Sequence, residues 1–219
     1  MRICVSSCAG TGKTTFIKDF LKNWPSYKSS GETYRKLIDD KKLVLNKEGN
    51  KTSQSIILDA LLDEAMKYKK EDNVIHDRGT LDNLIYTLWL KAKEKGDIDD
   101  IFIQKTFQLV KQSMFFYDVI FYIPYDDTTV TVEERKNRET DKEYNSELDN
   151  FFKAVHNMYY EKSTALFPFN DPSGVPAFIE IFGNRIERIE LAKLYIDADG
   201  NEYGEKDSLI SDFLDLKNK

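Results

Sequence analysis

The chain has 219 residues, of which 41% are hydrophobic and 32% are charged, and its formal net charge is −6. This length suits one α/β domain with a well-formed core. The sequence holds no run of the roughly 20 apolar residues that a membrane helix needs. Its acidic balance disfavours a general nucleic-acid binder, which needs a basic face. We therefore expect no membrane contact, and nucleic acid is a disfavoured partner.

The start of the chain and its cysteines predict the location of the protein. We expect no signal peptide, because the first predicted strand begins at residue 2. Cys4 and Cys8 lie in that strand and in the loop after it, which favours free thiols of a reducing cytosol over a disulfide or a metal site. The chain has only 2 histidines, which excludes a histidine-rich metal site. We expect a cytoplasmic protein.

Short apolar runs alternate with helical patterns along the chain. Five runs predict buried parallel strands, at 2–5, 42–45, 73–76, 119–123 and 177–182. The run at 42–45 is the weakest, and it fits the end of a helix as well. The alternation indicates βαβ units. We therefore predict a three-layer α/β fold, in which helices flank a parallel sheet of about five strands, within a single domain at 1–219.

Helical patterns and polar stretches divide the rest of the chain. Apolar residues recur at helical spacing in four segments, at 58–65, 81–88, 103–114 and 148–159. The polar stretch 46–53 predicts a loop, with Thr52 or Ser53 as the N-cap of the next helix. The C-terminal extension, about 196–219, predicts a hairpin turn followed by an acidic amphipathic helix at 208–216.

Residues 7–15, Ser-Cys-Ala-Gly-Thr-Gly-Lys-Thr-Thr, join the first strand to a predicted helix over 14–21. Backbone N–H groups of such a loop, together with the helix N-terminus, hold an anion without help from side chains. Lys13 adds a charge on the outer phosphates, and the Thr14 hydroxyl can hold Mg²⁺. We therefore predict a nucleoside triphosphate site with ATP and Mg²⁺ as cofactors. The residues predicted to bind the nucleotide here are Ala9, Gly10, Thr11, Gly12, Lys13, Thr14 and Thr15.

One position of this loop departs from the usual pattern. The P-loop pattern has Gly six residues before the lysine, where this chain has Ser7. The alternative interpretation is an ordinary strand-turn-helix with an incidental lysine. We favour the phosphate site because Gly12-Lys13-Thr14 is intact and stands between an N-terminal strand and a helix, which is the context that the motif requires.

His76-Asp77-Arg78 closes the third predicted strand. Ligands bind beyond the carboxyl ends of the strands of a doubly wound sheet, so Asp77 is expected near the phosphates. A carboxylate there can hold Mg²⁺ or accept a proton from an attacking hydroxyl. Arg78 can clamp an acceptor phosphate through two parallel hydrogen bonds. In the alternative interpretation, Asp77 caps the next helix and Arg78 pairs with a surface acid.

Asp82 and Tyr86 follow Arg78 at intervals of four residues, so the three share one helix face. If Arg78 faces the acceptor, all three line the substrate pocket. The alternative is that Asp82 forms a helix salt bridge and Tyr86 packs in the core. Gln54 is a further substrate candidate, because an amide can pair with the edge of a nucleobase.

Two arginine-containing segments are candidates for contacts with the nucleotide. Arg135 and Arg138 are three residues apart in a charged segment, and a lid at about 126–142 would place them over the triphosphate. A solvated linker is the alternative. Arg185, with Arg188 beyond it, follows the last apolar strand, where either side chain could stack on the base or face solvent.

These features, in this order, resemble the P-loop nucleoside and nucleotide kinases, above all the thymidylate kinase and deoxynucleoside kinase branch and the kinase domain of nicotinamide riboside kinases. Small proteins of this type occur in bacteriophages, in which case the location is the host cytoplasm. The resemblance spans roughly residues 1–190 by order of elements, but only short motifs match. It implies the three-layer P-loop NTPase fold. It also implies catalytic or metal-binding roles for the residues that match these motifs, which are Lys13, Thr14, Asp77, Arg78, Arg135 and Arg138. Kinases of this class are often dimers, so a homodimer is a further expectation.

The sequence therefore predicts a kinase that uses ATP and Mg²⁺ to phosphorylate a nucleoside or a (deoxy)nucleoside monophosphate. The segment 41–53 departs from the family and lies where the acceptor would be recognised, so the acceptor stays open. Two other functions fit the same loop. One is a 5′-hydroxyl polynucleotide kinase, which the acidic pI disfavours, and the other is an NTP-binding regulatory ATPase that holds a protein partner.

Overall fold

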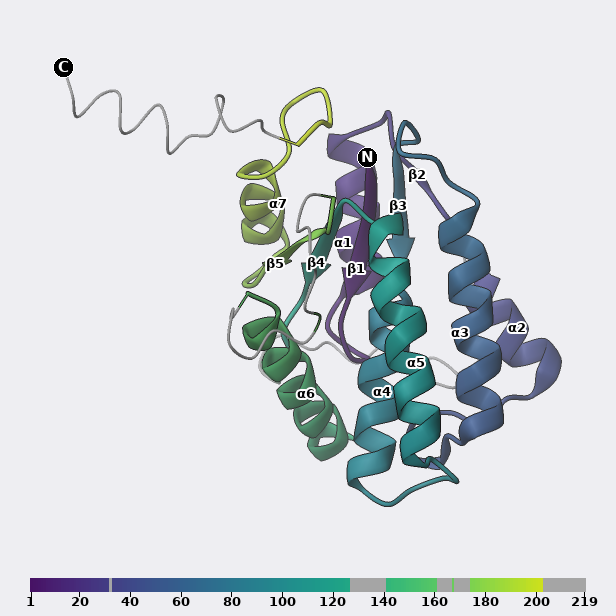
Figure 1. The fold of residues 1–219 in the computed structure, drawn as a ribbon. Helices are drawn as coiled ribbons and strands as arrows, with labels where there is room; N and C mark the ends of the chain where they lie inside the picture. The colour runs from purple at the N-terminus through teal and green to yellow at the C-terminus, as the bar shows by residue number, and fades with distance from the viewer. Residues whose placement is uncertain (32, 127–140, 161–166, 168–173, 203–219) are drawn as a thin grey trace.

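The computed structural model describes residues 1–31, 33–126, 141–160, 167 and 174–202, with the backbone alone at 33–36 and 160. Its sheet has five parallel strands in the order β2-β3-β1-β4-β5 (Figure 1). The strands are β1 (Arg2–Ser6), β2 (Lys28–Ser29), β3 (Val74–Asp77), β4 (Val119–Tyr122) and β5 (Ala177–Glu180). The predicted parallel α/β sheet is confirmed.

Helices connect the strands and cover both faces of the sheet (Figure 1). The α-helices are α1 (Lys13–Asn23), α2 (Thr33–Lys41), α3 (Lys51–Met66), α4 (Thr80–Ala92), α5 (Asp100–Ser113), α6 (Lys142–Tyr160) and α7 (Arg185–Lys193). Two short 3₁₀ helices, η1 (Asn46–Glu48) and η2 (Met114–Phe116), lie between them. In the described part of the chain, no helix has the length and apolar character needed to cross a membrane.

Successive side chains of each strand point to opposite faces of the sheet, so a hydrophobic core forms on each face. In β1, Ile3 and Val5 point to the face covered by α1 and α7, whereas Cys4 points to the face covered by α3, α4, α5 and α6. All three side chains are fully buried. Strands that are buried on both faces read as continuous apolar runs, which is why β1, β3, β4 and β5 were predictable from the sequence.

The prediction of a strand at 42–45 is wrong. These residues follow α2 as an irregular segment in which Val44 is exposed and Lys42 has a φ of 50°. The strand at this edge is instead β2, whose two residues, Lys28 and Ser29, are polar and exposed. An edge strand this short has no apolar run, and only its pairing with Val74 and Ile75 of β3 defines it.

Two smaller predictions have different outcomes. The N-cap of α3 is Asn50, whose side chain accepts a hydrogen bond from the Ser53 backbone N–H, so the prediction of Thr52 or Ser53 as the cap is wrong. The predicted hairpin turn is confirmed by an antiparallel bridge between Ile196 and Glu202. The segments 127–140 and 208–216 lie outside the described residues.

The sheet order determines where a ligand can meet several elements at once. β1 lies between β3 and β4, and Val5 is in register with Asp77. The Arg78 N–H then donates to Val5 O at 3.1 Å. The loop after β1 and the turn after β3 therefore lie side by side at the carboxyl ends of these parallel strands, which is where doubly wound sheets bind ligands.

Candidate functional site

The loop from Ser7 to Gly12 has the backbone of an anion cradle. Gly10 and Gly12 have φ values of 84° and 90°, which are unfavourable for residues with a Cβ. Gly12 is the N-cap of α1, and among the described residues no side chain caps this helix, which also has no acid in its first turn. By contrast, asparagine or aspartate side chains cap α3, α5 and α7. The N-terminus of α1 thus keeps its positive dipole end for a bound anion.

Ser7, the departure from the P-loop pattern, forms hydrogen bonds within the loop. Its side chain is fully buried. Its hydroxyl lies 2.6 Å from Thr11 Oγ1 and accepts a hydrogen bond from Lys13 Nζ at 2.9 Å. The serine therefore supplies a polar contact that the usual glycine cannot make, and it links the first and last parts of the loop.

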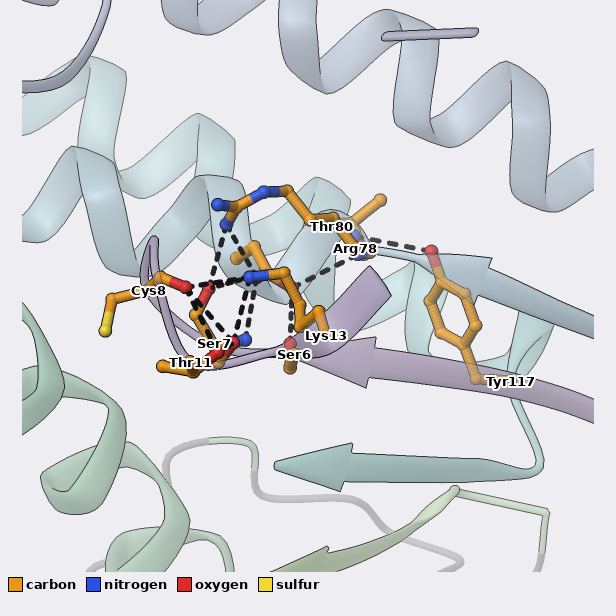
Figure 2. A network of polar contacts seen from close by, with 10 residues as sticks. Ser6, Ser7, Cys8, Thr11, Lys13, Arg78, Thr80 and Tyr117 are labelled. Carbon is orange, nitrogen blue, oxygen red and sulfur yellow. Dashed lines mark hydrogen bonds and ion pairs between the residues drawn. The ribbon is translucent and has the colours of Figure 1, made fainter. Parts of the chain in front are cut away.

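The Lys13 ammonium lies inside the loop (Figure 2). Its Nζ donates to the backbone carbonyls of Ser7 at 3.0 Å and Cys8 at 2.8 Å. Burial, followed by the nearby Arg78 guanidinium, lowers the pKa of Lys13 to about 7, against the opposing effect of Asp77. A phosphate placed in the cradle would offset this desolvation by pairing with the ammonium.

Asp77 and Arg78 reach the cradle from the end of β3. Asp77 is buried opposite Val5. Arg78 has a φ of 84°, a strained conformation for an arginine, and its Nη1 donates to Ser7 O at 2.9 Å (Figure 2). Backbone strain of this kind concentrates at functional sites. The structure thus brings Lys13, Asp77 and Arg78 together at one loop, as the sequence analysis predicted from the strand ends.

Asp82 lies in a buried hydrogen-bond network between α4 and the loop after β1. Its carboxylate accepts hydrogen bonds from the Ser6 hydroxyl, from the Gly79 N–H at 3.1 Å and from Arg78 Nη1 at 3.1 Å. A weaker contact of 3.3 Å joins it to the Ser7 N–H. Asp82 is almost fully buried and ties the start of α4 to the loop after β1. This geometry includes the helix ion pair that was the alternative interpretation of this residue.

Tyr86 and Gln54 contact other protein groups. The Tyr86 ring lies 5.2 Å from the Arg78 guanidinium carbon, and burial raises the pKa of its hydroxyl. Gln54 is buried between α3 and α4, where its side-chain oxygen accepts from Asn83 Nδ2 at 2.8 Å. Tyr86 is therefore linked to the cradle through Arg78, whereas Gln54 belongs to a neighbouring polar contact between two helices.

The arginines of α7 occupy two different environments. Arg185 is largely exposed and pairs with Asp19 of α1 at 2.7 Å. Arg188 is buried, and its Nη1 donates to Thr11 O of the cradle at 2.7 Å. Base stacking or exposure to solvent was expected for Arg188 from its place in the sequence. The contact with the loop could not be predicted, because no local signal links residues this far apart. Arg135 and Arg138, the predicted lid arginines, lie outside the described residues.

The proposed Mg²⁺ ligands fit the chemistry of that ion. Mg²⁺ usually keeps several waters and is held by one or two protein oxygens together with substrate phosphates. Thr14 opens α1 beside Lys13, and Asp77 offers a carboxylate at the end of β3. Within the described ranges, no cluster of three or more His, Cys, Asp or Glu side chains forms a closed metal cage. The donor set therefore fits a cation bound together with a nucleotide.

Comparisons of sequence identify the family. A family model described as an AAA domain matches residues 2–162. The chain belongs to this AAA-domain family. No curated protein matches the sequence of this AAA-domain protein.

Solved structures that match this chain include two kinases and the NadR protein. Deoxyadenosine kinase from M. mycoides, with the products dCMP and dCDP bound, matches with a TM-score of 0.59 and 18% identity, over 88% of this chain and 96% of that chain. Thymidylate kinase from Candida albicans matches with a TM-score of 0.54 and 13% identity, over 89% of this chain and 88% of that chain. The NadR protein in complex with NR matches with a TM-score of 0.57 and 14% identity, over 88% of this chain but 50% of that chain. At these identities the matches show a P-loop kinase-like fold for this AAA-domain protein.

Proposed function

We propose that this protein transfers the terminal phosphoryl group of ATP, with Mg²⁺, to a nucleoside or a (deoxy)nucleoside monophosphate. The observation that carries the proposal is the convergence of Lys13, Asp77 and Arg78 on one glycine-containing loop at the N-terminus of α1. A phosphate cradle alone would fit any nucleotide-binding protein. The added Asp-Arg pair, at the end of the neighbouring strand, supplies groups for a second substrate.

In this proposal the protein positions two substrates and stabilises charge. The acceptor oxygen attacks the terminal phosphorus in line, the new O–P bond forms, and the bond to the ADP oxygen breaks. Lys13 and the lid arginines, Arg135 and Arg138, offset the charge on the transferring group. Mg²⁺, held by Thr14 and by Asp77, would neutralise the phosphate oxygens. When the acceptor is a nucleoside hydroxyl, Asp77 would take its proton in place of holding the metal. When the acceptor is a nucleoside monophosphate, Arg78 would bind its phosphate.

The remaining predicted contacts complete this assignment. Residues 9–15 and Arg185 would bind the nucleotide, and Gln54, Asp82 and Tyr86 would act on the acceptor side, directly or by holding Arg78. The bond network of Asp82 supports a role through Arg78 and the loop after β1. A homodimer and a cytoplasmic location stay predictions, and sedimentation of the purified protein tests the first.

The test is ATP consumption with Mg²⁺ against a panel of nucleosides, deoxynucleotides, nicotinamide riboside and 5′-hydroxyl oligonucleotides. We expect one class of small acceptor to stimulate turnover, and Lys13→Ala and Asp77→Ala to lower it by about 100-fold or more. Lys193→Met, which removes an exposed cation of α7, is the matched control with a wild-type rate. Wild-type rates in both alanine variants would contradict the mechanism. Stimulation by oligonucleotides alone would favour a polynucleotide kinase, and ATP binding without any acceptor would favour a regulatory ATPase.

A further inference from the structure

Arg188 is a buried cation that α7 directs at the phosphate cradle. Its relative exposure is 9%, and burial lowers the pKa of its guanidinium, against the opposing effect of Asp126. Its Nη1 donates to Thr11 O at 2.7 Å, whereas its Nε is buried and has no hydrogen-bond partner among the described residues. Burying a charge that is incompletely paired is costly. This buried charge lies directly beside the loop that is proposed to bind phosphate.

The contact acts on the peptide group between Thr11 and Gly12. The carbonyl and the N–H of one planar trans peptide point in opposite directions. A charge-assisted bond that holds the Thr11 carbonyl toward α7 therefore directs the Gly12 N–H away from α7, to the side where a phosphate cradle presents its donors. The same bond polarises the peptide and makes its N–H a stronger donor.

The loop backbone and Arg188 fit closely together. A Cβ at Gly12 would lie 3.0 Å from Arg188 Nη1, which is tighter than most real contacts. Gly12 also has a φ of 90°, which few residues with a side chain adopt. Glycine at this position thus allows both the turn of the loop and the approach of the guanidinium. The position of α7 is set by its own packing, with Ile189 and Ala192 buried against the face of the sheet that α1 covers.

We propose that Arg188 is a positioning residue of the phosphate cradle, which orients and polarises the Thr11–Gly12 peptide so that its N–H binds a phosphate group of the nucleoside triphosphate. The inference rests on the proposed function only for the identity of the ligand. It assigns the C-terminal helix a part in phosphate binding. It also replaces the expectation that Arg188 stacks on the base or faces solvent.

The experiment measures the affinities of ATP and of inorganic tripolyphosphate, by calorimetry, for the full-length wild-type protein and for Arg188→Met. A hydrogen bond to a charged group contributes enough to change a dissociation constant by about 10- to 100-fold. We expect Arg188→Met to weaken both ligands by a similar factor in that range, and to raise the KM for ATP more than the KM for the acceptor. Lys193→Met, on the same helix but exposed, is the control and should bind both ligands as the wild type does.

Each outcome decides the inference. Weakening of ATP without weakening of tripolyphosphate would overturn it in favour of a base contact. Wild-type affinity for both ligands in Arg188→Met, whatever its melting temperature, would overturn it in favour of a purely structural role. Wild-type protein that binds neither ligand would overturn the proposed function together with this inference, whereas wild-type binding that Arg188→Met leaves unchanged overturns the inference alone.

Arg188→Lys provides a second variant if Arg188→Met does not fold. Lysine keeps the charge and the aliphatic stem but loses the planar guanidinium. We expect it to restore part of the affinity, leaving a loss of about threefold to tenfold for both ligands. Full wild-type affinity in this variant would show that charge alone acts on the ligand, which would contradict the orientation of the peptide by the guanidinium.

Discussion

At the scale of single residues, the environment of Lys13 predicts that nucleotide binding depends on pH. The pKa of Lys13 in the free protein is lowered to about 7, mainly by burial. Above that pH the side chain is largely neutral, and a bound triphosphate raises its pKa because the anion favours the ammonium form. We therefore predict that ATP binding at pH 8 takes up roughly one proton and that ATP affinity falls as the pH rises above about 7. Calorimetry in buffers of different ionisation enthalpy measures the uptake.

The control for this prediction is Lys13→Arg at the same pH. An arginine stays protonated in this range, so the variant should bind ATP without proton uptake, even if its affinity is lower. Equal uptake in the wild type and in Lys13→Arg would assign the proton to another group and contradict the prediction.

His76 predicts a different pH effect, on stability. Burial lowers the pKa of His76 to about 4, from a usual value of 6.5. Between these values the unfolded state binds the proton and the folded state does not, so stability falls as the pH drops from about 6.5 towards 4. The full effect is on the order of 3 kcal/mol. We predict that His76→Phe, which keeps edge contacts with Tyr68 and Tyr117, flattens this part of the stability curve.

Urea unfolding between pH 4.5 and 7 checks the His76 prediction. The difference in unfolding free energy between the variant and the wild type should shift in favour of the variant as the pH decreases. Parallel curves for the two proteins would show that His76 does not contribute to acid sensitivity.

At the scale of elements, the carboxylate of Asp82 joins α4 to the end of β1. It accepts from the Ser6 hydroxyl and the Gly79 N–H, and it pairs with Arg78. Asp82→Asn would turn an amide N–H₂ toward these donors and leave Arg78 without its carboxylate. We predict a loss of about 3 kcal/mol in unfolding free energy, because removing one partner leaves buried groups unsatisfied. Urea denaturation monitored by circular dichroism measures it.

The matched control for Asp82 is Asp100→Asn. Asp100 also lies in the first turn of a helix, α5, but its side chain is 83% exposed in an ion pair with Lys91. Surface pairs of this kind contribute little, so we expect a change of about 0.5 kcal/mol or less. Similar losses in both variants would mean that helix charge, and not the buried network, is responsible.

At the scale of the whole molecule, the segment 196–202 packs against the C-terminal end of α1 and the turn that follows it. Trp24 Nε1 donates to Asp197 O at 2.7 Å, and the Tyr27 hydroxyl donates to Gly200 O at 2.6 Å. Ile196 is almost fully buried. These contacts lie away from the cradle, so we expect them to affect stability and not nucleotide binding.

Two truncated chains test this role, one ending at Tyr195 and one at Glu202. The shorter chain loses one buried isoleucine and two hydrogen bonds. We therefore predict that its unfolding free energy is lower than that of the longer chain by about 3 to 5 kcal/mol. The ATP dissociation constants of the folded proteins should agree. Equal stability would show that the segment does not contribute to the core, and unequal ATP affinity would show a link to the site.

The sequence predicted those parts of the fold that depend on residues next to one another in the chain. Four of the strands have a buried and mainly apolar centre, and the cradle is nine consecutive residues between a strand and a helix. Because ligands bind beyond the carboxyl ends of parallel strands, the position of Asp77 at the end of a strand predicted that it lies near the phosphate cradle. β2 could not be found this way, because its two polar residues are a strand only through their pairing with β3.

The sequence by itself determined the α/β class, the phosphate cradle and the strand that brings Asp77 and Arg78 to it, because local backbone preference and apolar patterning decide these features. Only the tertiary structure decided which distant side chains meet. Arg188 bonds to Thr11 across 177 positions in the chain, and Asp82 bonds to Ser6 across 76. Such contacts depend on how each helix is rotated and seated against the sheet, which long-range packing sets and no local pattern records.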